Sequence, residues 1–310
     1  MQLHKNSKIY VAGHNGMVGS SILRLFKKKG YSNIIVRSRK KLDLVNQDKT
    51  IKYIKKIKPD FVIIAAAKVG GILANDKLKG DFIYKNLMIQ TNLIHASYLA
   101  GVKKLIFLGS SCVYPKYSKQ PINENELLSG KLEKTNDAYA IAKIAGIMMC
   151  NSYNSQYRTN FICLMPTNLY GPNDNYDLNK SHFYPALISK IQSAKINKKK
   201  SIVLWGNGKA KRELLYVDDL ANACEFFLKI KTNHTLINIG SGKEMTILEY
   251  CKFVMKKLGI NLKIKLDKSK PNGTPRKILN SNLAKKYGWK PLINLDQGFR
   301  LTYSDFMNKS

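Results

Sequence analysis

The sequence lacks the features of membrane-spanning, secreted and disulfide-bonded proteins. None of its apolar runs reaches the roughly 18 residues that a membrane-spanning helix needs. Residues 1–7 are mostly polar and the first apolar segment is short, so we do not expect a signal peptide or secretion. The odd number of widely spaced cysteines, without a C-x-x-C pair, predicts reduced thiols in a cytoplasmic protein and no metal site. They are Cys112, Cys150, Cys163, Cys224 and Cys251.

Acidic residues and arginine are also scarce. Asp and Glu number 20 against 53 Lys and Arg, which gives a formal charge of +33, and only 7 of the basic residues are Arg. A nucleic-acid-binding protein more often has a basic face with Arg and interleaved aromatics. Here the lysines are spread from Lys5 to Lys309. We therefore expect no nucleic-acid partner, although the positive field favours capture of anionic ligands.

The N-terminal segment has the pattern of a dinucleotide-binding turn. A short apolar strand, residues 8–12, runs directly into a G-x-x-G-x-x-G turn, and residues 20–29 then form a helical pattern that ends at Gly30. Glycines in this context let backbone N–H groups and the helix N-terminus approach a pyrophosphate. The residues expected at the cofactor are Gly13, Asn15, Gly16, Met17, Val18 and Gly19.

The next strand ends in a pair of arginines. Residues 34–36 are apolar, and Arg37 and Arg39 follow where an NAD site usually has an acid for the ribose hydroxyls. Guanidinium groups at this point favour a 2′-phosphate and hence NADP, the alternative being that both are merely solvated. Asp43 and Leu44 are then expected to line the adenine pocket.

Strands alternate with helices through the first half of the chain. The helix expected over residues 47–57 is followed by a strand at 61–64 and the small residues Ala65, Ala66 and Ala67. The helix expected over residues 81–100 precedes a strand at 104–108, which ends at Leu108 and Gly109. This alternation predicts an α/β fold with a Rossmann-type, doubly wound parallel sheet. We expect an NADP-binding domain over residues 1–172, with a late return segment near 213–240, and a mainly substrate-binding lobe over 173–310.

Tyr139 and Lys143 are four residues apart in a helical pattern, so both lie on one helix face. At about 4 Å and an effective dielectric of about 20, a positive charge contributes ~4 kcal/mol, which would move the pKa of a phenol toward neutrality. Such a phenol can protonate a ketone oxygen as hydride reaches the carbon. Tyr-x-x-x-Lys alone is a common pattern in ordinary helices. Ser110, at the end of a strand, adds a hydroxyl suited to binding a carbonyl.

The glycine turn, Ser110, Tyr139 and Lys143, in this order, resemble the extended short-chain dehydrogenase/reductase family. The resemblance implies that Ser110 polarises the carbonyl, Tyr139 gives the proton, and Lys143 holds the cofactor ribose and tunes Tyr139. It also places a nicotinamide-binding turn after the strand at 160–164, at Pro166, Thr167, Asn168 and Leu169.

Five runs, AAAKVGGI, LGSSCVYPK, YAIAKIAG, MPTNLYGP and KPNGTPRK, resemble the GDP-L-fucose synthase branch of that family over nearly the whole chain. The resemblance implies that Cys112 and His182 are the base and acid of epimerisation at C3 and C5, with His182 also at the cofactor. It implies GDP-sugar contacts from Lys190, Trp205, Arg212, Asn272 and Lys277. Without the motifs, Cys112 would be interpreted as a buried cysteine and His182 as a helix cap.

The implied function is NADPH-dependent reduction at C4, with 3,5-epimerisation, of GDP-4-keto-6-deoxy-mannose to GDP-L-fucose. Lys190 and Asn272 stand where this branch commonly has Arg and Asp. They motivate an alternative, a C4 reductase of a related GDP-4-keto-6-deoxy-sugar such as a heptose, without epimerisation. Outside enzymes, the alternatives are a non-catalytic NADP-binding regulator and a basic nucleic-acid binder. The family also implies a homodimer through the helices at 81–100 and 137–157.

Overall fold

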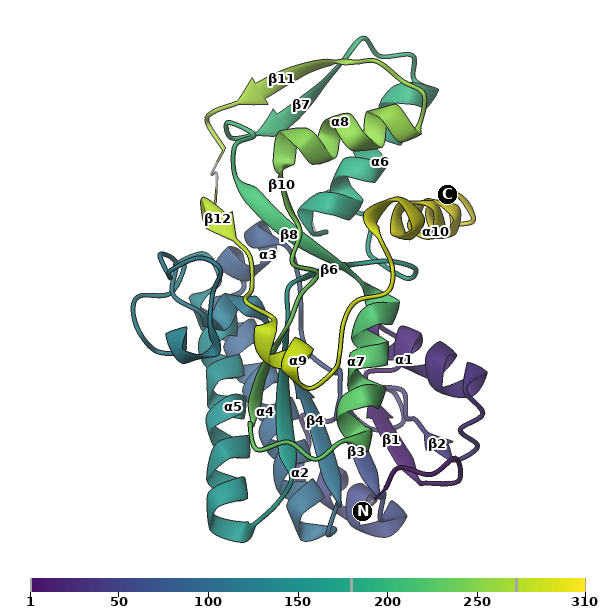
Figure 1. Ribbon diagram of the computed structural model, residues 1–310, viewed down its shortest axis with the longest axis vertical. Helices are drawn as coiled ribbons and strands as arrows, with labels where there is room; N and C mark the ends of the chain where they lie inside the picture. The colour runs from purple at the N-terminus through teal and green to yellow at the C-terminus, as the bar shows by residue number, and fades with distance from the viewer. Residues whose placement is uncertain (1, 179–180, 271–272, 310) are drawn as a thin grey trace.

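The computed structural model describes residues 2–178, 181–270 and 273–309, and its centre is a six-stranded parallel sheet (Figure 1). Its order is β2-β1-β3-β4-β5-β9, which confirms the predicted α/β, Rossmann-type fold. The strands are β1 Ile9–Ala12, β2 Ile34–Ile35, β3 Phe61–Ile64, β4 Lys104–Leu108, β5 Phe161–Pro166 and β9 Leu236–Ile239.

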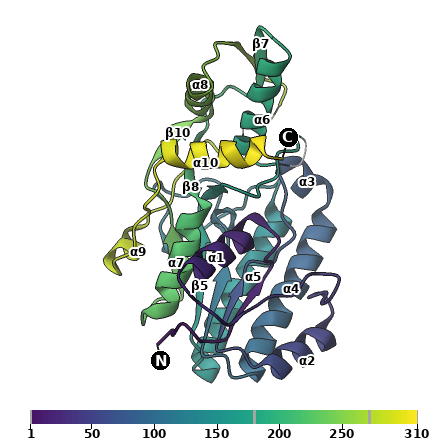
Figure 2. The ribbon, with the colours of Figure 1, turned by 90° about the vertical axis from the view of Figure 1, so that its right-hand side faces the viewer.

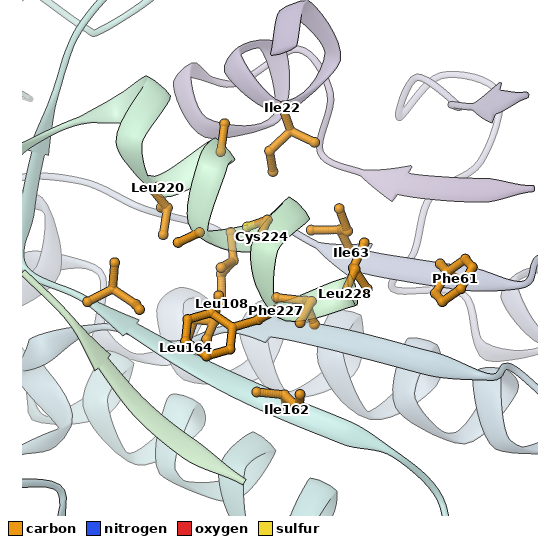
Figure 3. Close-up of a cluster of buried hydrophobic side chains, with 14 of the residues drawn as sticks. Ile22, Phe61, Ile63, Leu108, Ile162, Leu164, Leu220, Cys224, Phe227 and Leu228 are labelled. Carbon is orange, nitrogen blue, oxygen red and sulfur yellow. The ribbon is translucent and has the colours of Figure 1, made fainter. Parts of the chain in front are cut away.

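Helices cover both faces of this sheet (Figure 2). One face packs against α1 Met17–Lys28 and α7 Val217–Lys229, and the other against α2 Gln47–Ile57, α4 Lys79–Leu99 and α5 Asp137–Tyr157. Successive strand side chains point to opposite faces. Ile63 therefore joins the first core and Ile64 the second. Figure 3 shows Ile22 of α1 above Ile63 of the sheet, with Cys224 of α7 beside Ile63.

A smaller lobe stands at the carboxyl end of the sheet, with its own core (Figure 1). Its helices are α6 Phe183–Ile196, α8 Ile247–Lys257 and α10 Leu295–Met307. Its strands are β6 Asn168–Tyr170, β7 Ser201–Trp205, β8 Lys211–Tyr216, β10 Glu244–Thr246, β11 Lys263–Asp267 and β12 Arg276–Lys277. β8 pairs with β6, β10 and β12, and β7 pairs with β11.

Short elements complete the chain. They are α3 Ile72–Lys77, α9 Asn282–Lys286 and the 3₁₀ turns η1 Ser111–Val113 and η2 Glu124–Glu126. After passing through the lobe, the chain returns to the sheet, because Ala284 and Trp289 belong to the first core together with Ile9 of β1. Among the described residues, no helix combines the length and apolarity needed to cross a bilayer.

Two expectations about local structure were wrong. The first helix begins at Met17, three residues earlier than expected at Ser20, because Gly16 already serves as its N-cap and the glycine turn runs into the helix. The nicotinamide-binding turn was expected at Pro166 to Leu169, but Asn168–Tyr170 is a strand, β6, held by parallel pairing with β8. Pairing of this kind joins residues about 45 positions apart, for example Asn168 with Leu214, so local sequence does not reveal it.

Candidate functional site

The glycine turn after β1 forms a tight cradle. Gly13 has a φ of +86°, and a Cβ there would stand 2.6 Å from the backbone N of Ala66. A Cβ on Gly19 would stand 2.1 Å from the carbonyl oxygen of Gly13, so both positions require glycine. A Cβ on Gly16 would meet only the Gly13 oxygen, at an ordinary 3.6 Å. Gly16 and Asn15 are exposed, which leaves the N-terminus of α1 open to a phosphate.

The other predicted cofactor residues of the sheet follow neighbouring strands at the same edge. Ala65 to Ala67 follow β3, Leu108 ends β4, and Pro166 ends β5. Thr167 and Asn168 continue this line, with side chains that donate to the carbonyl oxygen of Glu213 at 3.3 and 3.2 Å. Leu169, Met17 and Val18 are half-buried beside them. The carboxyl edge of a parallel sheet is where dinucleotides bind, so these residues fit an NAD(P) cofactor.

The two arginines after β2 are both exposed. The Arg37 guanidinium lies 5.1 Å from the centre of the Tyr53 ring, and Arg39 pairs with Asp43 at 3.6 Å. Leu44 packs against the second core and its carbonyl accepts from Asn92 at 2.9 Å. Arg37 and Arg39 thus form a positive rim next to the glycine cradle. Asp43 partly offsets the charge of Arg39.

Tyr139 and Lys143 lie on one face of α5, as predicted. The Lys143 Nζ is 5.8 Å from the centre of the Tyr139 ring and donates to the carbonyl oxygen of Leu108 at 2.8 Å. The Leu108 contact anchors α5 to the end of β4, so the lysine has little freedom. A Cβ on Gly109, which follows Leu108, would displace the end of the Met165 side chain.

The expectation that Lys143 lowers the pKa of Tyr139 was wrong for the protein by itself. Burial is the largest influence and raises the pKa of Tyr139, and negative charge on Cys112 adds to it. Burial also lowers the pKa of Lys143 to about 8. Desolvation disfavours the charged form of both groups, and the Lys143 ammonium is directed to Leu108 rather than to the phenol oxygen. Tyr139 is thus a protonated donor over the whole physiological range.

Ser110 caps the 3₁₀ turn η1 that carries Cys112. The Cys112 Sγ donates to the Ser110 Oγ at 2.9 Å, and the Cys112 backbone N lies 3.4 Å from the same oxygen. Cys112 is buried but lines a small pocket with Lys277. The carbonyl-binding hydroxyl and the thiol expected from the sequence are therefore direct neighbours.

His182 is the N-cap of α6, and its ring makes no capping hydrogen bond. Its side chain is exposed, yet surrounding protein lowers its pKa, and the positive charge of Lys277 lowers it further. Cys112 in turn raises the pKa of Lys277. Electrostatic coupling through Lys277 therefore links the predicted acid and the predicted base.

Two of the predicted GDP-sugar contacts are paired in one small sheet. Arg212 of β8 and Lys277 of β12 are register partners. Burial lowers the pKa of Arg212 to about 10 and also lowers the pKa of Lys277. Lys190 and Trp205 lie farther out in the lobe, where the Lys190 Nζ donates to the carbonyl of Val203 at 2.8 Å and Trp205 is 40% exposed. The predicted contact Asn272 lies outside the described residues.

Sequence reasoning missed two acids. Glu213 is fully buried and accepts from the backbone N–H of Gly242 at 2.6 Å and of Leu279 at 2.9 Å. It thereby joins β8, the loop after β9 and the segment after β12. Glu133 lines the pocket beside Cys112. The only sequence signal for Glu213 was its position as a lone acid immediately before the apolar run 214–217. Glu133 had no such signal.

No group of three or more His, Cys, Asp or Glu suited to a metal ion occurs in the described ranges.

Comparison with known proteins places these features in a family. The model of the NAD dependent epimerase/dehydratase family matches residues 9–240, which include the glycine cradle, Ser110, Tyr139 and Lys143. The chain belongs to the NAD dependent epimerase/dehydratase family. Within this family it is 50% identical over 308 residues to a GDP-L-fucose synthase of Sinorhizobium fredii, covering 99% of this chain and 98% of that protein.

Solved structures of family members have the same fold. A GDP-6-OMe-4-keto-L-xylo-heptose reductase from C. jejuni superposes with a TM-score of 0.92, at 36% identity and with full coverage of both chains. A GDP-L-fucose synthetase from Naegleria fowleri bound to NADP has a TM-score of 0.90 and 26% identity, covering 100% of this chain and 96% of the other. The predicted kinship with GDP-L-fucose synthases is confirmed, and the family supports a nicotinamide dinucleotide as the cofactor.

Proposed function

We propose that the protein reduces C4 of GDP-4-keto-6-deoxy-mannose with NADPH and epimerises C3 and C5, which produces GDP-L-fucose. The observation that carries the proposal is the contact between the Cys112 thiol and the Ser110 hydroxyl, next to Tyr139 and Lys143. The hydroxyl assigned to carbonyl reduction thus lies against a thiol suited to removing a proton. The GDP-L-fucose synthase named at 50% identity supports the same reaction.

In the reduction, a nicotinamide dinucleotide held at the glycine cradle would supply the hydride that reaches C4. The Ser110 hydroxyl donates to the C4 oxygen and polarises the carbonyl. Tyr139 then transfers its phenolic proton to that oxygen, so ketone, hydride and proton give the alcohol. Lys143, held by Leu108, places a positive charge near the phenolate that forms. The protonated Lys143 stabilises the Tyr139 phenolate, whereas burial of Tyr139 destabilises it.

Epimerisation requires removal of a proton from one face of C3 or C5 and its return to the other. The 4-keto group acidifies these positions, because the carbanion is stabilised as an enolate. We assign removal to the Cys112 thiolate and return to the His182 imidazolium, which leaves the substrate with the same atoms and inverted configuration. The charge of Lys277 acts on His182, and Cys112 acts on Lys277, so this cation influences both groups.

The nucleotide part of the substrate needs cations for its two phosphates. Arg212 and Lys277, adjacent in β8 and β12, supply them, and Trp205 offers an exposed aromatic face for the base. Lys190 adds a point charge in the same lobe. The GDP-sugar accordingly spans from the outer lobe to Cys112.

The cofactor form, assembly and location are parts of the same proposal. Arg37 and Arg39 favour NADP, as does the NADP-bound relative. A homodimer forms through α4 and α5, whose neighbouring surfaces expose Tyr84 (56%), Ile141 (47%) and Met148 (44%). All five cysteines are free and buried, which suits the reducing cytoplasm.

A second candidate is a C4 reductase of a GDP-4-keto-6-deoxy-heptose without epimerase activity. The C. jejuni heptose reductase, with its TM-score of 0.92, favours it. Product analysis separates the two. We expect incubation with NADPH and GDP-4-keto-6-deoxy-mannose in deuterated water to give GDP-L-fucose with deuterium at C3 and C5 by NMR. A reduced product without deuterium would support the second candidate, and no NADPH oxidation would refute the first.

A further inference from the structure

A small polar pocket adjoins Cys112. The loop after β4, the loop before α5 and the segment leading into β12 form it, with Cys112, Lys116, Glu133, Asn136, Thr274 and Lys277 among its lining residues. Its free space is ≈ 10 Å³, about what one water molecule or one hydroxyl occupies. The pocket is therefore too small for a phosphate or a base but fits a single substituent of a sugar.

Glu133 is the only acid among the described residues that line this pocket. Its side chain is 15% exposed, and its Oε2 lies 2.9 Å from the Lys116 Nζ. The backbone holds both partners in place, because Lys116 N donates to Lys131 O at 2.9 Å and Asn136 N donates to Glu133 O at 3.0 Å. The carboxylate is thus fixed before any substrate enters.

The charges around Glu133 decide what can enter. Its negative charge acts on Arg212 and on Lys277, which places these two cations within its electrostatic reach. The diphosphate is attracted to Arg212 and Lys277 and repelled by Glu133. Because Lys116 pairs with one carboxylate oxygen, Oε2, a neutral group that reaches Glu133 must donate a hydrogen bond. A sugar hydroxyl has these properties, and a methyl group does not.

We propose that Glu133 is a specificity-determining residue that accepts a hydrogen bond from a ring hydroxyl of the sugar next to the carbon that faces Cys112. Lys116 is the positioning residue that holds the carboxylate. This inference rests on the proposed function, because it takes the sugar to lie at Cys112. The enzyme therefore prefers sugars that carry a hydroxyl on the ring carbon facing Glu133 over sugars that lack this hydroxyl.

The first experiment measures binding without turnover. Affinities of the NADP-bound protein for GDP-mannose and for GDP alone are compared by calorimetry for wild type, Glu133→Gln and Glu126→Gln. Glu126 is the matched control, an acid nearby in the same loop that accepts from Ser129 instead of lining the pocket. We expect Glu133→Gln to weaken GDP-mannose about tenfold and leave GDP unchanged, since a bond to a charged acceptor is the stronger one. Glu126→Gln should change neither.

Equal weakening of GDP and GDP-mannose would overturn the proposal, because Glu133 would then act only by positioning Lys277 and Arg212. Unchanged affinity for both ligands would also overturn it. Retained melting temperature and NADPH affinity in Glu133→Gln establish that the variant is folded. This comparison needs no catalysis, so it remains decisive even if wild type fails to oxidise NADPH with a GDP-keto-sugar, a failure that would refute only the proposed reaction.

The second experiment identifies the hydroxyl. KM is measured for GDP-4-keto-6-deoxy-mannose and for its 2-deoxy and 3-deoxy analogues. We expect Glu133→Gln to raise KM about tenfold for the parent and for one analogue, and to leave KM for the other analogue unchanged, since the bond is already absent there. Lys116→Met should give a smaller change with the same pattern. The same KM increase with the parent and both analogues would overturn the assignment.

Discussion

The Cys112 thiol donates a hydrogen bond to the Ser110 hydroxyl, with sulfur and oxygen 2.9 Å apart. The groups assigned to epimerisation and to reduction are thus in direct contact, at the end of one strand. Because each hydrogen bond fixes both partners, a change at either residue alters the environment of the other. The two half-reactions are nevertheless separable by substitution, since Tyr139 takes part in only one of them.

Cys112→Ala should abolish epimerisation and spare reduction. We expect deuterium incorporation at C3 and C5 to fall about 10²- to 10⁴-fold, the usual contribution of a general base, while NADPH oxidation continues and gives an unepimerised product. NMR of the product measures both. Cys150→Ala is the matched control, because Cys150 is a buried core residue on α5. If Cys112→Ala and Cys150→Ala both incorporate less deuterium, each in proportion to its loss of stability, the role of Cys112 is refuted.

Tyr139→Phe should lower the rate of NADPH oxidation about 10²- to 10⁴-fold, because no other phenol is assigned to protonate the C4 oxygen. The affinity for NADPH, measured by fluorescence, should stay within about twofold. Tyr153→Phe provides the comparison on the same helix, since the Tyr153 hydroxyl only contacts His95 Nδ1 at 2.9 Å. Near-normal turnover in Tyr139→Phe would contradict the assignment.

Arg37→Ala combined with Arg39→Ala should raise KM for NADPH about 10- to 100-fold and leave KM for NADH nearly unchanged. The physical reason is that a hydrogen bond to a charged group contributes about 1.5–3 kcal/mol, and NADH has no 2′-phosphate to receive it. Steady-state kinetics with the two cofactors tests this. Arg300→Ala on α10, where Arg300 pairs with Asp296, controls for loss of positive charge. An equal effect on both cofactors would exclude 2′-phosphate recognition.

Asp174→Asn should stabilise the protein at neutral and higher pH. Burial raises the pKa of Asp174 to about 7, with a smaller contribution from Asp305, while Lys309 and the Asn175 N–H oppose the rise. The folded state then holds this proton while the unfolded chain releases it at about pH 4, so wild-type stability falls from about pH 4 to 7 and is level above.

We expect the gain in free energy of unfolding for Asp174→Asn to be about 1 kcal/mol or more at pH 8 and close to zero at pH 4. Urea unfolding at the two pH values measures it. Asp48→Asn is the opposite control, because Asp48 stands in the first turn of α2, where a carboxylate stabilises the helix. A gain at pH 8 no larger than that at pH 4 would show that Asp174 is not held protonated.

The sequence predicted what depends on local pattern. The alternation of strands and helices predicted the parallel, doubly wound sheet, and the i, i+4 relation predicted that Tyr139 and Lys143 share one helix face. Ser110 was found in the same way, from its place at the end of β4.

What the sequence did not predict depends on distant pairing and on burial. Glu213 and Glu133 acquire their roles from Leu279 and Lys277, which are 66 and 144 positions away. The direction of the Tyr139 pKa shift was missed because spacing gives the distance to a charge but not the loss of water around the phenol. The roles of these two acids and the direction of the Tyr139 pKa shift both depend on the three-dimensional arrangement of the chain.

Trp289 and Ala284 pack into the first core next to α7 and β9, where the Trp289 indole donates to Asn222 at 3.2 Å and α9 contacts β9. The ribosome makes α7 and β9 before it makes Trp289. These two elements therefore emerge with part of their apolar surface still uncovered, and they reach final packing only after the segment around Trp289 has followed. Replacement of residues 282–289 by a foreign sequence would for the same reason loosen the packing of α7 and β9.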